Sequence, residues 1–308
     1  MNLLQLIRSF VSTVESGSIA GAGRNLGISA AAVSQNIARL EAHLGIRLLN
    51  RTTRSLALTE RGQLYFDQVR VIERQLEYAR QVASGDDAEP VGRLRISSTA
   101  AFARHMLAPM LPALHASHPG LEIELLIGDD LADHALEGLD ASIRIDPQLQ
   151  EGLVARCIAT VPFVLCAAPD YLARQGRPRT LEELREHPLV LFRYPVDGRY
   201  LRWAFLRDGE RIEPELRPAM VSNDIDAIAA MTAAGAGIAR LAAFVAKPFL
   251  ERGQLVEFMM EDEVATSLEP MKLYLCVSDR RDWTPKLRAF LRHVHSHLPA
   301  AWRVGADE

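Results

Sequence analysis

The chain has 308 residues, enough for more than one folded domain, and 48% of them are hydrophobic. Its formal net charge is −4 at pH 7, which argues against a nucleoid-type protein that coats DNA without sequence preference. Charged residues interrupt the apolar segments, so we expect neither a signal peptide nor a membrane span, and we expect a cytoplasmic protein.

Near the amino terminus, the sequence predicts two helices joined by a tight turn. The first runs from Ala20 to Asn25 and the second begins at Ala30. Gly27 can take the positive φ that ends the first helix, and Ser29 can cap the second. Along the second helix, an apolar stripe recurs at helical spacing and should be buried: Val33, Ile37, Leu40 and Leu44.

The opposite face of this second helix begins with small side chains, so the helix could lie close to base edges in a major groove. Gln35 could pair with an adenine. A plain amphipathic helix pair has the same turn and spacing, so these features alone favour neither interpretation. The candidate DNA-reading residues are Ser29, Ala30, Ala31, Ser34, Gln35 and Ala38.

A basic hairpin follows, with extended runs at 46–49 and 56–59 around a polar tip. Its side chains could contact phosphates or enter a minor groove, although arginines on a loop could also be solvated surface charge. Residues 1–58 hold six arginines and two acidic residues, a net +4 that leaves −8 for the rest. This asymmetry favours a winged DNA-binding domain over 1–58. The wing candidates are Arg51, Thr52, Thr53 and Arg54.

Two runs of this region resemble the LysR-type transcriptional regulators: FVSTVESGS from Phe10 to Ser18, and AVSQNIARLEAHLGIRLLNRTTRSLALTERG from Ala32 to Gly62. The sequence departs from the family where Ala30, Ala31 and Gln35 stand, so an operator sequence does not carry over. The resemblance implies double-stranded DNA as a partner and a homodimer or homotetramer. It also implies a small-molecule effector of unspecified identity, and RNA polymerase as a further partner.

A long helix is expected from Glu60 to about Ala83, with Thr59 as its cap. Its apolar residues alternate spacings of four and three, which is typical of a coiled-coil seam. Packing on the chain's own core is the alternative, but no core has formed nearby in the sequence, and the resemblance also implies a dimer. We therefore expect a dimerisation linker over 59–91, ending in a polar hinge. The seam residues are Tyr65, Val69, Ile72, Leu76, Ala79 and Ala83.

From 92 to about 300, β-type runs alternate with helical segments, which is typical of an α/β domain with a mostly parallel sheet. The resemblance makes this domain a two-lobed, periplasmic-binding-protein-like fold with crossovers near 161 and 268. Lobe 1 would comprise 92–161 and 268–300, and lobe 2 would comprise 162–267. The expected strands are Leu94–Ser97, Leu121–Ile127, Ala141–Ile145, Val161–Ala167, Leu189–Phe192 and Met271–Val277. The expected helices are Met106–Ser117, interrupted at its prolines, Asp224–Ala234 and Thr284–His297.

A cleft between two lobes could bind a small molecule. The segments Ser97–Thr99 and Ser222–Asp224 each lead from a strand into a helix and could hold an anion, although each alone could be an ordinary helix cap. Polar residues at a strand end and in an irregular Arg- and Tyr-rich stretch are weaker candidates. The candidate effector-binding residues are Ser98, Thr99, Arg144, Asp146, Arg202, Trp203 and Asn223.

No catalytic motif of the GxSxG, Walker A or HExxH type is present, and we expect no catalytic residue, metal or cofactor. The three cysteines lack CxxC spacing and are expected to be reduced thiols, with redox sensing left open. An enzyme or a solute-binding module with an incidental helix-turn-helix is the alternative, but neither needs a wing or a dimer seam. We therefore expect a DNA-binding transcriptional regulator controlled by a small organic anion.

Overall fold

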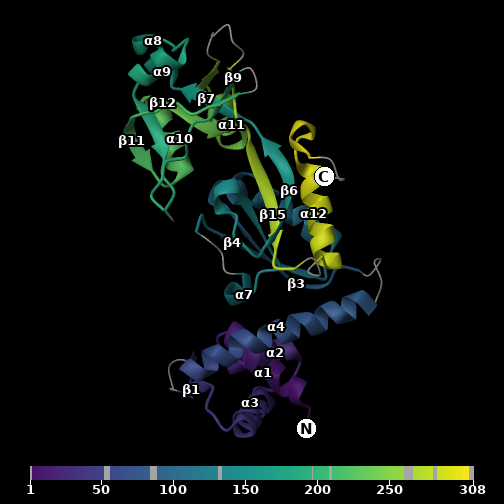
Figure 1. Ribbon diagram of the computed structural model, residues 1–308. Helices are drawn as coiled ribbons and strands as arrows, with labels where there is room; N and C mark the ends of the chain where they lie inside the picture. The colour runs from purple at the N-terminus through teal and green to yellow at the C-terminus, as the bar shows by residue number, and fades with distance from the viewer. Residues whose placement is uncertain are drawn as a thin grey trace. The chain divides into compact units, whose positions relative to one another are not determined.

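The computed structural model describes residues 2–51, 56–83, 89–130, 134–195, 197–207, 210–259, 266–279 and 283–304. The chain forms two compact units, Met1–Ala88 and Glu89–Glu308 (Figure 1). The first is mainly helical and the second combines helices with β-sheets, which confirms the predicted α/β class with an amino-terminal helix-turn-helix. The hinge expected at 84–92 falls largely outside the described residues.

The first unit is a helix-turn-helix followed by a two-stranded wing and a long helix. Gly27 has a φ of 66° and ends the first helix of the motif, as predicted. The Ser29 hydroxyl accepts a hydrogen bond from the Ala32 amide at 3.1 Å and caps the second helix. The elements are α1 (Leu3–Glu15), α2 (Ile19–Leu26), α3 (Ala30–Leu44), β1 (Leu49–Arg51), β2 (Leu56–Leu58) and α4 (Glu60–Ala83).

The wing begins later than the sequence predicts. β1 pairs antiparallel with β2, with Leu49 opposite Leu58, whereas 46–48 lie outside the strand. The Glu41 carboxylate of α3 accepts hydrogen bonds from the amides of Leu48 and Leu49 at 2.8 and 3.1 Å. A side chain of α3 therefore satisfies these donors and ties the start of the wing to that helix.

The long helix α4 has its predicted bounds, and Thr59 is its cap. The Thr59 hydroxyl accepts a hydrogen bond from the Gly62 amide at 2.9 Å and donates to the Arg47 carbonyl at 2.8 Å. The first turn of α4 passes so close to the wing that a Cβ on Gly62 would lie 2.0 Å from the carbonyl oxygen of Leu48. Only glycine fits here without displacing the backbone.

The expectation that the seam of α4 meets no core of its own chain is wrong for its first turns. Val69 is only 3% exposed and belongs to the core of the helix-turn-helix. The ring centroids of Tyr65 and Phe66 lie 5.9 and 6.2 Å from that of Phe10, because α1 packs against this part of α4. Ile72, one turn further, is 48% exposed.

The second unit contains two five-stranded sheets, and we call the parts built on them lobe 1 and lobe 2. Lobe 1 has the strand order β4–β3–β5–β15–β6, and lobe 2 has the order β11–β8–β12–β7–β13. The strands of lobe 1 are β3 (Gly92–Ser98), β4 (Leu121–Ile127), β5 (Ala141–Ile145), β6 (Val154–Val161) and β15 (Met271–Val277). The strands of lobe 2 are β7 (Phe163–Ala167), β8 (Leu189–Phe192), β11 (Pro218–Ser222), β12 (Ile238–Ala242) and β13 (Val256–Phe258).

The chain passes between the lobes twice, at two neighbouring points. β6 ends at Val161 and β7 begins after Pro162; the return leads through Pro270 into β15. Val161 and Met271 are paired across the antiparallel ladder, so the two crossings leave lobe 1 together. Before the return, β14 (Thr266–Leu268) pairs with β9 (Phe205–Arg207), which also pairs with β10 (Glu210–Ile212).

The prediction of a mostly parallel sheet is wrong, because each large sheet is mixed. In lobe 1, β3 pairs parallel with β4 and β5, whereas β15 pairs antiparallel with β5 and β6. Lobe 2 repeats this pattern around β8 and β7. The antiparallel strands are those that carry the chain between the lobes. The predicted strand Val161–Ala167 lies at such a crossing, so it is two strands in different sheets. Pro162 separates them, because it has no amide hydrogen to donate to a ladder.

The helices of the second unit cover its sheets. After β3, α5 (Ala100–Phe102), the π-helical turn η1 (Ala103–Leu107) and α6 (Ala108–Ser117) form one interrupted helix, so the predicted irregularity lies just before the prolines. The others in lobe 1 are α7 (His134–Glu137), η2 (Asp146–Gln148), α12 (Pro285–His297) and η4 (Ala300–Trp302). Lobe 2 has α8 (Pro169–Gln175), α9 (Leu181–Glu186), α10 (Ile225–Ala233) and α11 (Ala243–Glu251).

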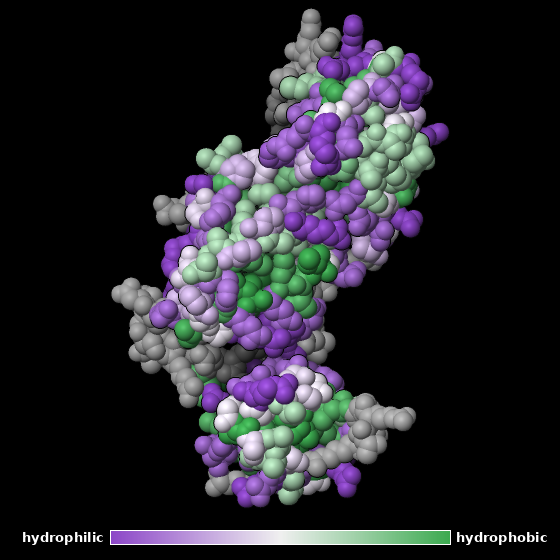
Figure 2. All heavy atoms as spheres, turned by 180° about the vertical axis from the view of Figure 1, so that it is seen from behind, coloured by the Kyte–Doolittle hydropathy of each residue, from purple (hydrophilic) through white to green (hydrophobic). Residues whose placement is uncertain are grey.

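On the face shown in Figure 2, hydrophilic and hydrophobic residues are interspersed over both units. Among the described residues, no helix has both the length and the apolar composition needed to cross a bilayer.

Candidate functional site

In the first unit, α3 has one buried face and one exposed face. Val33, Ile37 and Leu40 are fully buried in the core. The predicted reading residues lie on the other side: Ser29, Ala30, Ala31, Gln35 and Ala38 are exposed, and Ser34 is half-buried. The amino-terminal half of α3 thus presents a narrow face with one long polar side chain, Gln35, which suits close approach to base edges.

Two polar residues on the inner edge of α3 hold this face in place, and neither was a candidate from the sequence. The Asn36 amide donates a hydrogen bond to the Ser9 hydroxyl of α1 at 2.9 Å, and Ser9 is fully buried. Glu41 holds the wing, as described above. Both lie beside the apolar stripe, and a polar residue at that position of an amphipathic helix is a usable sequence signal.

The wing follows α3 in the chain and contains a further candidate, Arg51. Arg51 ends β1 opposite Leu56, next to the hairpin tip. Thr52, Thr53 and Arg54 fall outside the described residues, so their contacts stay predictions.

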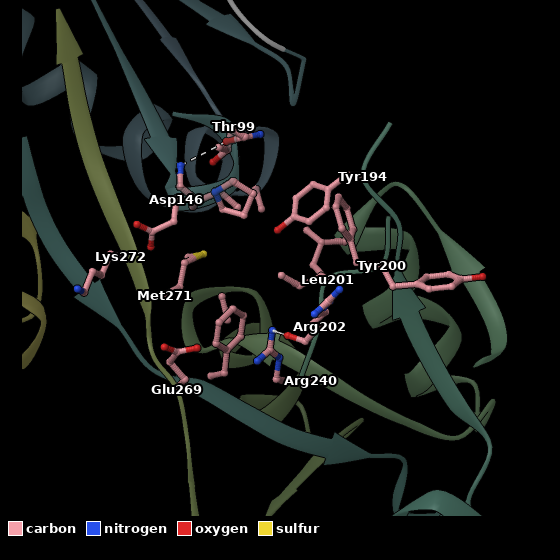
Figure 3. Close-up of a pocket in the computed structure, with 18 of the residues that line it drawn as sticks. Thr99, Asp146, Tyr194, Tyr200, Leu201, Arg202, Arg240, Glu269, Met271 and Lys272 are labelled. Atoms are coloured by element: carbon pink, nitrogen blue, oxygen red, sulfur yellow. Dashed lines mark hydrogen bonds between the residues drawn. The ribbon is translucent and has the colours of Figure 1, made fainter. Parts of the chain in front are cut away.

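In the second unit, a cavity of ≈ 790 Å³ lies between the lobes (Figure 3). This volume falls within the range of small-molecule sites. Lobe 1 contributes Thr99, Asp129 and Asp146, and lobe 2 contributes Tyr194 and Arg240, among others. Apolar side chains form much of the wall: Ile145, Phe163, Phe192, Ile225, Phe244 and Met271.

Arg240 is the most unusual group of the lobe 2 wall. It is 4% exposed, and its guanidinium lies 4.1 Å from the centroid of the Phe163 ring. One Nη donates a hydrogen bond to the Arg202 carbonyl at 2.8 Å, whereas Nε has no hydrogen-bond partner among the residues that the structure describes. Burial lowers the pKa of Arg240 to about 10, so the group is still charged at neutral pH. Sequence reasoning missed Arg240 because it lies in an Ala- and Gly-rich run.

Tyr194 also lines the cavity from lobe 2. Its hydroxyl is buried without a hydrogen-bond partner in the part of the chain that the structure describes, and in Figure 3 it points into the cavity. Burial raises the pKa of Tyr194, so the phenol keeps its proton and can donate it to a ligand. No signal in the sequence pointed to this tyrosine beyond the irregular stretch in which it occurs.

The carboxylates nearest to Arg240 are already paired with exposed arginines. Glu213 lies 2.7 Å from Arg202 and also pairs with Arg211, and Glu269 lies 2.8 Å from Arg211. A hydrogen bond from Arg202, followed by that from Arg211, holds the pKa of Glu213 below its usual range although burial opposes this. The buried guanidinium is therefore left without an ion-pair partner within the described residues.

The lobe 1 wall does not have the anion site expected at Ser97–Thr99. The Asp129 carboxylate accepts a hydrogen bond from the Ala100 amide at 3.1 Å, so the helix start already holds a negative group. Gln148 donates to the Asp129 carbonyl at 3.0 Å and fixes that residue. Burial raises the pKa of Asp129, and the Ala100 hydrogen bond opposes the rise.

The structure brings together only some of the predicted effector residues. Thr99, Asp146 and Arg202 line the cavity. Ser98 is fully buried, and its hydroxyl donates to the Thr99 carbonyl at 3.4 Å. Arg144 is 2% exposed and donates a hydrogen bond to the Ser97 hydroxyl at 2.6 Å, so its side chain is held inside lobe 1.

Trp203 and Asn223 also lie away from the cavity lining. Trp203 is 3% exposed and packs in the core of lobe 2, because an indole in this stretch buries more apolar area than the neighbouring Arg202. Asn223 precedes α10, where the Asp224 carboxylate accepts a hydrogen bond from the Ala227 amide at 2.9 Å. That helix start is thus an ordinary cap.

A second feature joins the lobes beside the cavity. Asp226 of α10 accepts hydrogen bonds from Arg104 and His105 of η1, each at 2.6 Å, and Asp224 lies 3.5 Å from Arg104. We call these four residues the interlobe clasp. Burial acts to raise the pKa of Asp226, but the hydrogen bonds from His105 and Arg104 outweigh it and hold the pKa below its usual value.

A winged helix-turn-helix with an exposed reading face, in one chain with a two-lobed domain that encloses a cavity, defines a ligand-responsive DNA-binding regulator. Residues 4–63 match the family model of the bacterial regulatory helix-turn-helix protein, lysR family, and residues 87–299 match that of the LysR substrate binding domain. The chain belongs to the LysR family of transcriptional regulators. This confirms the resemblance and the prediction of a regulator rather than an enzyme.

The similar proteins include both a transcriptional repressor and an activator. The uncharacterized HTH-type transcriptional regulator YcaN of Escherichia coli (strain K12) is 32% identical over 93% of this chain and 92% of its own. An HTH-type transcriptional repressor of Pseudomonas aeruginosa (strain UCBPP-PA14) is 32% identical over 83% and 81%. The full-length structure of the Vibrio cholerae virulence activator AphB covers 96% of this chain and 99% of its own, with 28% identity and a TM-score of 0.56.

Proposed function

We propose that this LysR-type regulator binds its operator as a homodimer or homotetramer. Its affinity for DNA changes when a small organic anion occupies the interlobe cavity. The observation that carries the proposal is the buried Arg240 guanidinium, which lines the cavity and has no ion-pair partner among the described residues. A ligand shifts the protein only if it binds one arrangement of the lobes more tightly than another.

Residues 1–58 bind the DNA in this mechanism. The exposed face of α3 reads bases, with Gln35 as its long polar reader, and Arg51 with the wing residues at 52–54 contacts phosphates. Residues 59–91 act as the linker, and the exposed Ile72 supports the proposal that the later part of α4 pairs with a second copy. A cytoplasmic site of action and contact with RNA polymerase rest on family membership alone.

The test is fluorescence anisotropy of the full-length protein on DNA upstream of its own gene and on random DNA, at fixed salt. We expect Gln35→Ala to lose about 1–3 kcal/mol on the preferred site and little on random DNA. His43→Gln, exposed at the far end of the same helix, is the matched control and should bind like wild type. Equal loss on both DNAs would contradict a reading role for Gln35.

A further inference from the structure

We infer that the ligand of the interlobe cavity is a carboxylic acid with a hydrogen-bond donor at its other end. Its carboxylate pairs with Arg240 and Tyr194 on lobe 2, and its donor group faces Asp129 on lobe 1. This inference rests on the proposed function, and it adds the chemical class and the orientation of the ligand.

The lobe 2 wall contains a buried cation, Arg240. A buried charge is costly unless an opposite charge and hydrogen bonds satisfy it. Within the described residues, Arg240 lacks an ion-pair partner and its Nε lacks a hydrogen-bond acceptor. Glu213 and Glu269 are held by Arg202 and Arg211. A ligand carboxylate would satisfy the guanidinium in its planar, two-point geometry.

The Tyr194 hydroxyl adds a second unused donor to the lobe 2 wall. It is buried, has no hydrogen-bond partner among the described residues, and points into the cavity. Two unsatisfied donors that line one cavity, one of them cationic, suit an anionic acceptor and disfavour an amine.

The lobe 1 wall is acidic where the lobe 2 wall offers donors. Asp129 fills the helix start, so a ligand anion placed there would meet a carboxylate within the same cavity. Asp146 adds a further acidic side chain to this wall. The basic residue of lobe 1 that lines the cavity, Lys272, lies on the Asp146 side in Figure 3 and away from Tyr194. This end therefore suits a hydrogen-bond donor such as an ammonium or hydroxyl group.

The walls between these ends are apolar and aromatic. Phe163, Phe192 and Phe244 line the cavity together with Ile145, Ile225 and Met271. A flat apolar body would bury its faces against these side chains while its two ends meet Arg240 and Asp129.

The experiment uses three related aromatic probes and isothermal titration calorimetry of the full-length protein. Benzoate has only the carboxylate, benzylamine has only the ammonium, and 4-(aminomethyl)benzoate has both. We expect 4-(aminomethyl)benzoate to bind most tightly, benzoate less tightly and benzylamine least. Failure of both carboxylates to bind at millimolar concentration, or tighter binding of benzylamine, would overturn the inference.

Variants assign the two ends. Arg240→Met should weaken both carboxylates by about 10- to 100-fold, the loss of a charged hydrogen-bond partner. It should still fold, because it removes an uncompensated buried charge. Tyr194→Phe keeps the ring and should weaken them less. Asp129→Asn should remove the preference for 4-(aminomethyl)benzoate over benzoate. Arg177→Met is the matched control, because Arg177 also lies over a phenylalanine ring of lobe 2, at 5.6 Å, but outside the cavity lining.

Measuring DNA affinity in the same samples separates the two proposals. If the carboxylates bind Arg240→Met as tightly as wild type and still change DNA affinity, the orientation proposed here is wrong while the proposed function stands. If they bind wild type and lose affinity in Arg240→Met, yet never change DNA affinity, the ligand class stands and the proposed function fails.

Discussion

Replacing Gly62 with alanine should destabilise the DNA-binding unit, although alanine is the better helix former by about 1 kcal/mol. The new Cβ would lie 2.0 Å from the carbonyl oxygen of Leu48 and 2.8 Å from its carbon. That oxygen is not free to move, because it accepts hydrogen bonds from the Thr59 amide at 2.9 Å and the Thr59 hydroxyl at 3.3 Å. Breaking these bonds costs about 1 kcal/mol each, and the overlap itself costs about 1–3 kcal/mol.

After subtracting the gain in helix propensity, we expect Gly62→Ala to lower the free energy of unfolding of Met1–Ala88 by about 2–4 kcal/mol. In urea the midpoint should fall by about 1–2 M. Far-ultraviolet circular dichroism reports the helices of this unit, whereas all three tryptophans lie in the other unit. The dichroism transition should therefore shift while the tryptophan fluorescence transition stays in place.

Gly128→Ala is the matched control, because a Cβ there would meet no atom within 4 Å. It should leave both transitions unchanged or raise the fluorescence transition slightly. If Gly62→Ala stabilises the first unit, as alanine does on an exposed helix, the close approach of α4 to the wing would be refuted.

Three further predictions concern the clasp and α4. Asp226→Ala should weaken binding of 4-(aminomethyl)benzoate about 5- to 10-fold by calorimetry. The effect is modest because most of it comes from the His105 hydrogen bond, since Arg104 is partly exposed and its ion pair adds little. If the effects of Asp226→Ala and Arg104→Ala on binding were fully additive, this would argue against the clasp. Because the pKa of Asp226 is lowered, the stabilisation that its carboxylate gives the clasp is present above the ordinary carboxyl pKa and lost as the pH falls through the lowered pKa. The difference in ligand affinity between Asp226→Ala and wild type should therefore persist down to about pH 4 and vanish below it. Ile72→Asp should yield monomers in light scattering, and an intact dimer would exclude this part of α4 from the interface.

Local signals of the sequence predicted local structure well. Gly27 and Ser29 fix the helix-turn-helix because a positive φ and a hydroxyl cap depend on neighbouring residues alone. The bounds of α4 follow from Thr59 and a regular seam. The direction of the sheet strands failed, because the pairing of β15 with β5 and β6 joins segments more than a hundred residues apart, and periodicity says nothing about such pairing.

The cavity was harder to predict than the DNA-binding face. A reading face on one helix follows from residue spacing, so Gln35 and its neighbours could be chosen directly. The cavity walls come from two lobes, and Arg240, Tyr194 and Asp129 lie on separate elements. Hydroxyl residues before a helix were reasonable candidates, but Asp129, which the fold brings to that helix start from another loop, already occupies it. Trp203 and Arg144 were drawn into the interiors of the lobes instead.

The paired crossings between the lobes have a mechanical consequence. They leave lobe 1 side by side at Val161 and Met271, and each carries a proline at that point, Pro162 or Pro270. Proline fixes φ and gives the ladder no amide hydrogen, so the hydrogen-bonded ribbon is weakest there. Two adjacent strands with a weak line across them behave like a leaf hinge, which resists stretching and shear but turns easily about one axis. Free energy from a molecule bound between the lobes would thus be delivered as rotation, with the clasp as the contact that holds the lobes in the arrangement that encloses the molecule.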